Sequence, residues 1–296
     1  MKFLTLGSHR LGVVVGESVV DIPEACRSLG QRSLPETLRE LIEVGEAAAQ
    51  AAWETARRAV EAKVAVRPLA SVRPRAPIPE PRRNILCIGK NYRAHVSEVA
   101  ATALGGGGIP ERPIFFTKAT TAVIGPGDWI PSHRELTGRL DYEAEVAVII
   151  GRGGRDIPPA EAMEHVFGYT AINDVSARDL QAGHVQWFRG KSLDGFAPMG
   201  PLVVHRSAMR PVEEIKVSCR VNGELRQEGN LGQLIFDIPT IIATLSAGMT
   251  LLPGDIIATG TPKGVGAGFD PPRFLVPGDR VEVEVTDVGV LTNLVE

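Results

Sequence analysis

The chain has 296 residues, of which 44% are hydrophobic and 23% are charged, and these proportions are ordinary for a globular protein. Its 32 basic and 35 acidic residues give a formal net charge of −3, which argues against nucleic acid or an anionic membrane as a partner. The N-terminus lacks the apolar core of a signal peptide and the longest apolar run is too short to cross a bilayer, so we expect a soluble, cytoplasmic protein.

The first seventy or so residues predict a small module of their own. Three short runs rich in β-branched residues predict strands at residues 3–6, 11–15 and 19–22. A capping-box pattern at 33–36 opens an alanine-rich stretch that predicts a helix to about Lys63. Residues 73–83 contain four prolines, too many for a helix or a central strand. We therefore predict a small, β-rich N-terminal domain at 1–73 and a main domain at 74–296.

The main domain has a mainly β pattern. Pro-Gly-Asp occurs at 126–128, 253–255 and 277–279, and proline followed by glycine is typical of type II turns. Asn222-Gly223 predicts a tight hairpin, and the valines of 281–285 alternate with polar residues as in a strand with one buried face. Residues 239–245 predict a short helix. Because strands and helices do not alternate, we expect an α+β, mainly β, roll or barrel-like domain.

Residues 140–150 form the most informative segment. As a strand, this segment places Glu143 and Glu145 on one face, and the apolar residues on both faces after them predict a central strand. Two carboxylates at the end of a buried strand repel each other and lose hydration, and a bound cation would compensate for both effects. The alternative is a solvated Glu-x-Glu pair on an edge strand.

Asp174 supplies a third candidate ligand at the end of a second strand-like run, 169–174. The three hard oxygen donors favour Mg²⁺, or Mn²⁺, over Zn²⁺. They would fill half of roughly six octahedral positions and leave room for water and a bidentate substrate. Spacing alone does not place Asp174 beside the glutamate pair.

His95 and Glu98 form a candidate catalytic pair. Residues 91–104 read as helical, so side chains three positions apart share a face. A glutamate that orients an imidazole makes a general base for a water near the metal. The glycines at 105–108 suit the hinge of a lid. The alternative is an exposed helix whose histidine and glutamate simply face water.

Several other polar positions are weaker candidates. Lys191 lies in Gly-Lys-Ser, but a phosphate loop needs glycine at position 185, where this chain has valine. Gly260 and Thr261 offer a backbone N–H and a hydroxyl suited to a carboxylate, or form a plain turn. Lys118 follows an apolar run. Cys87 reads more naturally as a buried packing cysteine than as a reactive thiol, and the cysteine spacing fits neither zinc nor a disulfide framework.

Five segments in a fixed order make the main domain recognisable. They are GKNYRAHVSE at 89–98, DYEAE at 141–145, NDVSARD at 173–179, GKSLD at 190–194 and GTPKGVG at 260–266. Together they resemble the fumarylacetoacetate hydrolase family over about residues 84–296, three quarters of the chain. The N-terminal module resembles the small leading domain of some members more weakly.

The resemblance implies a fold, a metal and an assembly. The fold would be the family's mixed β-roll, and the assembly a homodimer. Glu143, Glu145 and Asp174 would be the ligands of Mg²⁺. Members act on small 2-oxo acids by carbon–carbon bond cleavage, decarboxylation, isomerisation or dehydration.

The resemblance also implies roles for individual side chains. His95 and Glu98 match a catalytic pair on a short lid helix of members that cleave acylpyruvates. Lys191 would direct its charge at the substrate carboxylate or the developing enolate. Gln181 would donate a hydrogen bond to a substrate oxo group, although a simple polar helix residue remains the alternative. Gly260 and Thr261 match the family's substrate loop, and Lys118 is a further candidate for substrate contact.

We therefore expect a Mg²⁺-dependent hydrolase that cleaves a C–C bond in acylpyruvate-like 2,4-dioxo acids. His95, helped by Glu98, would deprotonate water, and the metal and Lys191 would stabilise the resulting enolate. The alternative is an isomerase or decarboxylase of unsaturated 2-oxo diacids that uses the same metal site. A metal-binding protein without turnover is a third interpretation, and the intact catalytic positions argue against it.

Overall fold

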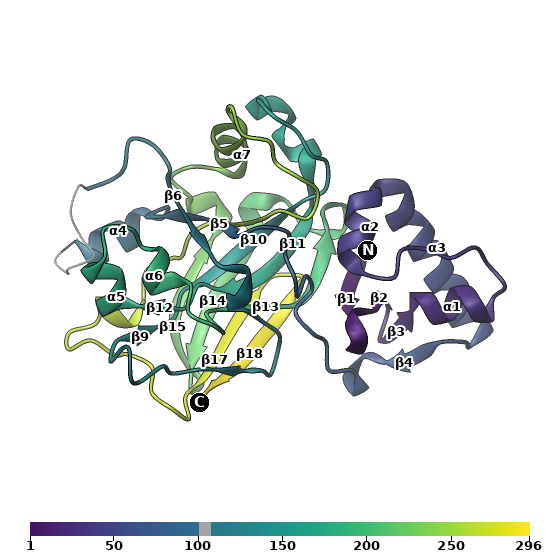
Figure 1. Ribbon diagram of the computed structural model, residues 1–296, viewed down its shortest axis with the longest axis horizontal. Coiled ribbons are helices and arrows are strands. Elements are labelled where there is room, and N and C mark those ends of the chain that lie inside the picture. The colour runs from purple at the N-terminus through teal and green to yellow at the C-terminus, as the bar shows by residue number, and fades with distance from the viewer. Residues whose placement is uncertain (101–107) are drawn as a thin grey trace.

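The computed structural model describes residues 1–100 and 108–296, and in this part of the chain the fold is α+β and mainly β, as predicted (Figure 1). The α-helices are α1 (Ile22–Ser28), α2 (Leu38–Val44), α3 (Glu46–Ala62), α4 (Arg93–Val99), α5 (Arg178–Gly183), α6 (Phe188–Lys191) and α7 (Ile238–Ser246). The strands are β1 (Lys2–Thr5), β2 (Leu11–Val15), β3 (Ser18–Asp21), β4 (Val66–Pro68), β5 (Ile85–Gly89), β6 (Ile114–Lys118), β7 (Val123–Ile124), β8 (Trp129–Ile130), β9 (Leu140–Asp141), β10 (Ala144–Ile150), β11 (Val166–Asn173), β12 (Ser176–Ala177), β13 (Ala197–His205), β14 (Lys216–Val221), β15 (Glu224–Asn230), β16 (Ile256–Ala258), β17 (Arg280–Val285) and β18 (Gly289–Val295). Over the described ranges, the helices are too short or too polar to cross a membrane.

The N-terminal module has its strands where the sequence predicts them, but its helices differ. Strands β1, β2 and β3 confirm the three predicted strands. The predicted helix start at 33–36 is wrong, because the capping box lies at Thr37 and Glu40 and the helix begins at Leu38. Gly45, with a φ of 101°, then separates α2 from α3. The sequence analysis did not predict α1, whose N-terminus is capped by the side chain of Asp21.

One large sheet joins the two parts of the chain. Its strand order is β4-β3-β2-β1-β13-β11-β10-β16-β5-β6, with β7 beside β13. Because β1 pairs antiparallel with β13, the N-terminal strands extend the sheet of the main domain (Figure 1). The proline-rich segment 73–83 forms neither helix nor strand, as predicted. It contacts β1 through a bridge between Thr5 and Arg75 and through a hydrogen bond from the hydroxyl of Thr5 to the carbonyl of Pro77. The division into domains at residue 73 stays a prediction.

A second sheet, in the order β15-β14-β17-β18-β8, packs against β10, β11 and β13. Its hairpin turns at Asn222 and Gly223, whose φ angles of 53° and 82° confirm the predicted tight turn. The alternating valines of β17 are buried, as predicted. The glycines of the three Pro-Gly-Asp turns have φ angles of 74°, 88° and 92°, and α7 confirms the predicted helix at 239–245.

The strands that carry the acidic residues lie in the middle of the large sheet. Every residue of β10 is buried between β11 and β16, which confirms the predicted central strand. The predicted strand 140–150 is interrupted, however, so that Glu143 lies just outside β10. Helices α4, α5 and α6 gather at the end of the molecule away from the N-terminal helices (Figure 1). Of the predicted helix 91–104 the structure shows Arg93–Val99, and residues 101–107, with most of the proposed hinge, lie outside the described residues.

Candidate active site

Three buried carboxylates meet where β10 begins and β11 ends. Ala144 pairs with Asn173 in the antiparallel ladder, so the residues just beyond it, Glu143 and Asp174, face each other across the strand ends. The backbone N–H of Asp174 donates to the carbonyl of Glu143 at 2.8 Å. One oxygen from each of Glu143, Glu145 and Asp174 lies within 4.8 Å of the others. The sheet register therefore brings Asp174 to the glutamate pair, which spacing alone could not do.

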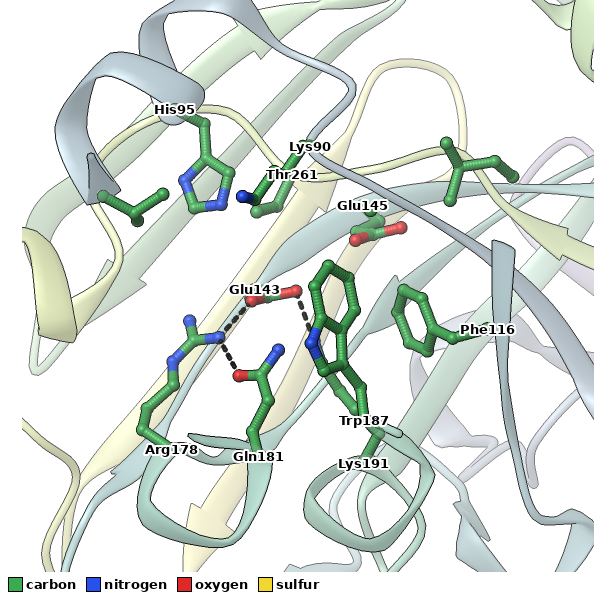
Figure 2. A pocket seen from close by; sticks show the side chains of 13 residues that line it. Lys90, His95, Phe116, Glu143, Glu145, Arg178, Gln181, Trp187, Lys191 and Thr261 are labelled. Atoms are coloured by element: carbon green, nitrogen blue, oxygen red, sulfur yellow. Dashed lines mark hydrogen bonds and ion pairs between the residues drawn. The ribbon is translucent and has the colours of Figure 1, made fainter. Parts of the chain in front are cut away.

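Three buried cations surround this triad. The Nζ atom of Lys191 lies 2.7 Å from Glu143 and 2.8 Å from Asp174, and that of Lys118 lies 2.5 Å from Asp174. The guanidinium of Arg178 donates from Nη1 to Glu143 at 2.6 Å (Figure 2). Although burial opposes ionisation, Lys191 and Arg178 hold the pKa of Glu143 below its usual value.

Among the described residues, Glu145 forms no ion pair with a cationic side chain. Burial, reinforced by the charges of Asp174 and Glu143, raises the pKa of Glu145 well above its usual value. Its Oε2 atom accepts one hydrogen bond, from the backbone N–H of Gly260 at 2.7 Å. With Asp141 included, four buried carboxylates face three buried cations and leave one negative charge uncompensated. A hard divalent cation fits this oxygen-only donor set, and would leave the site with a net positive charge suited to an anionic substrate.

His95 and Glu98 lie together above the triad, on α4. The Nδ1 atom of His95 lies 3.3 Å from Oε2 of Glu98, and the imidazole is 7% exposed. With the proton assigned to Nδ1 for this hydrogen bond, Nε2 is left to exchange a proton in the pocket. Figure 2 shows the imidazole above Glu143 and beside Thr261. The structure thus places His95 at the cavity that Glu143 and Glu145 also line, whereas Glu98 and Asp174 lie outside the lining.

The cavity has a polar and an apolar side, and its empty volume of about 410 Å³ includes space that is open to solvent. Its lining is Ile88, Gly89, Lys90, His95, Val99, Phe116, Glu143, Glu145, Arg178, Gln181, Trp187, Lys191 and Thr261. Charged and hydrogen-bonding groups come from the strand ends, α4 and α5, and an aromatic pair comes from β6 and the segment before α6 (Figure 2). One side of a bound molecule would therefore meet charges and the other would meet rings.

The remaining predicted residues lie at different distances from the cavity. Gln181 lines it, and its Oε1 accepts from Arg178 at 3.1 Å. Thr261 also lines it, although its hydroxyl donates to the carbonyl of Ala144. Gly260 and Lys118 do not line the cavity. The backbone N–H of Gly260 donates to Glu145, and the fully buried Lys118 donates to Asp174. The assignment of these residues to substrate contact stays a prediction.

Arg178 is a site residue that the sequence analysis did not single out. Its Nε donates to Asp141 at 2.8 Å, and the same carboxylate accepts hydrogen bonds from the backbone N–H groups of Gly266 and Ala267. The other terminal nitrogen, Nη2, is buried without a hydrogen-bond partner among the described residues. An arginine four positions after a candidate ligand, in NDVSARD, is the sequence signal that could have identified it.

A packing contact explains the Gly-Lys-Ser sequence. A Cβ added at Gly190 would lie 2.5 Å from the backbone N of Gln181 and 2.8 Å from the carbonyl of Ala177. Glycine therefore lets α6 approach α5 closely enough for Lys191 to reach the triad. Cys87 is fully buried in β5, where burial and then the charge of Asp174 raise the pKa of its thiol, in agreement with the packing interpretation.

Comparison with known proteins agrees with this architecture. Residues 84–296 match the family model described as fumarylacetoacetate (FAA) hydrolase C-terminal. The chain is 46% identical over 302 residues to oxaloacetate tautomerase YisK of Bacillus subtilis (strain 168), covering 99% of each chain. Two solved structures are similar over the full chain. A fumarylacetoacetate hydrolase from Exiguobacterium antarcticum has a TM-score of 0.81, 40% identity and coverage of 100% and 99%. A maleylpyruvate hydrolase from Sphingobium sp. SYK-6, in complex with manganese (II) ion and pyruvate, has a TM-score of 0.74, 33% identity and coverage of 100% and 98%.

The chain therefore belongs to the fumarylacetoacetate hydrolase family. The fold and the resemblance predicted from the sequence are both confirmed. The family is one of enzymes, and the matched relatives carry tautomerase and hydrolase names. The named relatives catalyse different reactions, so family membership alone does not identify the reaction that this chain catalyses.

Proposed function

We propose that this chain catalyses the keto–enol tautomerisation of a small 2-oxo diacid such as oxaloacetate, with Mg²⁺ or Mn²⁺ at the triad. The observation that carries the proposal is that His95, Glu143 and Glu145 line one cavity, while Glu98 contacts His95 and Asp174 completes the carboxylate cluster outside the lining. Full-length similarity to an oxaloacetate tautomerase supports the reaction type over a C–C hydrolase. The proposal therefore replaces hydrolysis, the activity expected from the sequence, as the first candidate.

The proton transfer can be assigned to His95. In the forward direction the C3–H bond breaks, its electron pair forms the C2=C3 double bond, and the proton passes to Nε2. The C2=O π pair moves onto the 2-oxo oxygen, which then takes the proton back from Nε2 of the imidazolium, so that the enol is complete and the imidazole is neutral again. Glu98 accepts the Nδ1–H throughout and stabilises the imidazolium that forms, since the two groups already lie 3.3 Å apart.

The charged groups bind and orient the diacid. A divalent cation held by Glu143, Glu145 and Asp174 would supply Lewis-acid stabilisation of the charge that develops on the 2-oxo oxygen. Lys191, which lines the cavity beside the triad, adds a positive charge at the same place. The unpartnered Nη2 of Arg178 suits an anionic oxygen of the second carboxylate, because a guanidinium pairs with carboxylates in a fixed geometry.

Hydrolysis of a 2,4-dioxo acid is the second candidate. The similar maleylpyruvate hydrolase binds manganese and pyruvate, and pyruvate is the kind of fragment that such a cleavage releases. The same His95–Glu98 pair could deprotonate water instead of C3–H. An isomerase or decarboxylase acting on a related 2-oxo diacid would use the same charged groups. A homodimeric assembly and a cytoplasmic location stay predictions.

One assay series separates these reactions. The protein is stripped with chelator and reloaded with Mg²⁺ or Mn²⁺. Loss of enol absorbance from oxaloacetate, release of CO₂ from it, and release of pyruvate from acylpyruvates are then measured in parallel. Metal-dependent enol conversion, lost in Glu145→Ala but kept in the exposed control Glu135→Ala, is the expected result. Pyruvate release without enol conversion would overturn the tautomerase proposal in favour of the hydrolase.

A further inference from the structure

An aromatic wall closes one side of the cavity. Trp187, in the segment that leads into α6, lies with its ring centroid 5.4 Å from that of Phe116 on β6, at an interplanar angle of 67°. Both rings line the cavity, and Figure 2 shows them on the same side of the carboxylates. Edge-to-face packing of this kind is a favoured arrangement and stabilises the position of the two rings.

The wall also depends on the absence of a side chain at Gly89, the last residue of β5. A Cβ there would overlap Cζ3 of Trp187 and lie 2.9 Å from Cη2. The indole therefore lies directly against the β5 backbone, where another residue type would displace it. Gly89 and Trp187 come from distant parts of the sequence, and their contact requires both the glycine and the large ring.

The wall adjoins the charged side of the cavity. The Nζ atom of Lys191 lies 5.1 Å from the centroid of Phe116. The ring that packs against Trp187 therefore also contacts a lysine that is ion-paired with the triad. A substrate whose first carboxylate and oxo group face the triad, with its second carboxylate at Arg178, would therefore place a bulkier substituent near the indole. Trp187 lines the cavity and is half-buried, so part of the side chain remains accessible.

We propose that Trp187 determines specificity by limiting the size of the substituent that a 2-oxo acid carries beyond C3. The inference rests on the proposed function for the class of ligand and deepens it by naming the residue that selects among such acids. Short diacids fit in front of the indole, whereas an aromatic substituent would need the space that the indole occupies. An apolar pocket discriminates by about 10–200-fold for a difference of one methylene, so removal of a whole ring should be easy to measure.

The test compares two probes of different size on the Mn²⁺-loaded protein. Pyruvate is the small probe and 2,4-dioxo-4-phenylbutanoate is the large one, and binding of each is measured by calorimetry. Trp187→Ala should raise the affinity for the large probe relative to pyruvate by about tenfold or more. Phe188→Ala is the matched control, since Phe188 is an adjacent aromatic residue that is 44% exposed and does not line the cavity.

Two further variants guard against a misfolded result. Trp187→Phe keeps an aromatic ring and should change the ratio in the same direction as Trp187→Ala, but less. Gly89→Ala keeps the indole but forces it from its place, and should also change the ratio. The sequence has three tryptophans, and the double variant Trp53→Phe, Trp129→Phe retains only Trp187. Binding of either probe to this variant should change the fluorescence emission of Trp187.

The outcomes separate the inference from the proposed function. If the ratio and the Trp187 emission both respond as expected but enol conversion is absent, the wall selects the ligand and the tautomerase proposal fails. If enol conversion is present while the ratio in Trp187→Ala equals that in Phe188→Ala, the specificity inference is overturned. An emission from Trp187 that ignores both probes would also overturn it, because a residue in contact with the ligand must sense it.

Discussion

Glu98 links the imidazole of His95 to the loop after β16 through both of its carboxylate oxygens. Oε2 lies 3.3 Å from Nδ1 of His95, and Oε1 accepts a hydrogen bond from the backbone N–H of Gly264 at 2.7 Å. Two residues further on, the N–H of Gly266 donates to Asp141, which holds Arg178. The proposed base and the proposed substrate-binding arginine are therefore positioned by the same short loop.

Loss of the His95 imidazole should remove proton transfer but leave metal binding intact. We expect His95→Ala to lower kcat by about 10²–10⁴-fold, the range of a general acid–base contribution. Glu98→Gln should cause a smaller loss, because the imidazole remains but its oriented, charged partner does not. Initial rates of enol conversion give both values. Ser97→Ala, an exposed change on the same helix, is the control, and a His95→Ala variant as fast as the control would rule out this base.

Glu145 should have opposite effects on stability with and without metal. Burial and two neighbouring carboxylates raise the pKa of Glu145, so its ionised form destabilises the metal-free protein at neutral pH. Glu145→Gln should therefore raise the free energy of unfolding in the presence of chelator. In the unaltered protein, a metal at 100 times its Kd should add about 2.7 kcal/mol, and the variant should lose most of this gain. Urea unfolding with and without Mn²⁺ measures both, and an equal metal effect in the two proteins would exclude Glu145 as a ligand.

Asp141 should be important for stability although it lies outside the triad. Its carboxylate accepts four hydrogen bonds, from Nε of Arg178 and from three backbone N–H groups, at 2.7–3.0 Å. Asp141→Asn keeps the size of the side chain but removes the negative charge that pairs with the buried guanidinium of Arg178. Loss of one partner of a buried ion pair lowers the free energy of unfolding by about 3–5 kcal/mol. Urea unfolding checks this, with the exposed Asp194→Asn as the control. A loss no larger than the control's would show that the loop is held by other contacts.

His205 should make stability depend on pH at the junction of β13 and α3. Burial, only partly offset by Glu46 at 3.1 Å, lowers the pKa of His205 in the folded protein. The unfolded chain therefore binds the proton more tightly, so the contribution is present above pH 6.5 and is lost as the pH falls through that value toward the folded-state pKa. Unfolding free energies at pH 7.5 and 5.5 should differ less in His205→Asn than in the unaltered protein. An equal difference would show that other groups cause the pH dependence.

Local sequence patterns predicted much of the fold for a physical reason. The turn at Asn222-Gly223, the strand with buried valines and the helix at 239–245 depend on backbone preferences and on side-chain periods within a few residues. The errors arose where two such signals competed. Ser33 and Thr37 both begin an S/T-x-x-E pattern, and the structure places the cap at the second. Ile22 suits a strand by its side chain, but Asp21 caps a helix there.

Short segments with a recognisable order and chemistry predicted the family, the candidate metal ligands and the candidate catalytic pair. The groups that surround these residues depend instead on contacts between segments that are distant in the sequence. The β10–β11 register places Asp174 opposite Glu143, and the approach of α5 brings Arg178 to both Asp141 and Glu143. The contact of Trp187 with Gly89 likewise joins segments that no local pattern relates. Such pairings depend on how the sheet aligns its strands and on how closely helices pack onto it, and neither is encoded within a few neighbouring residues.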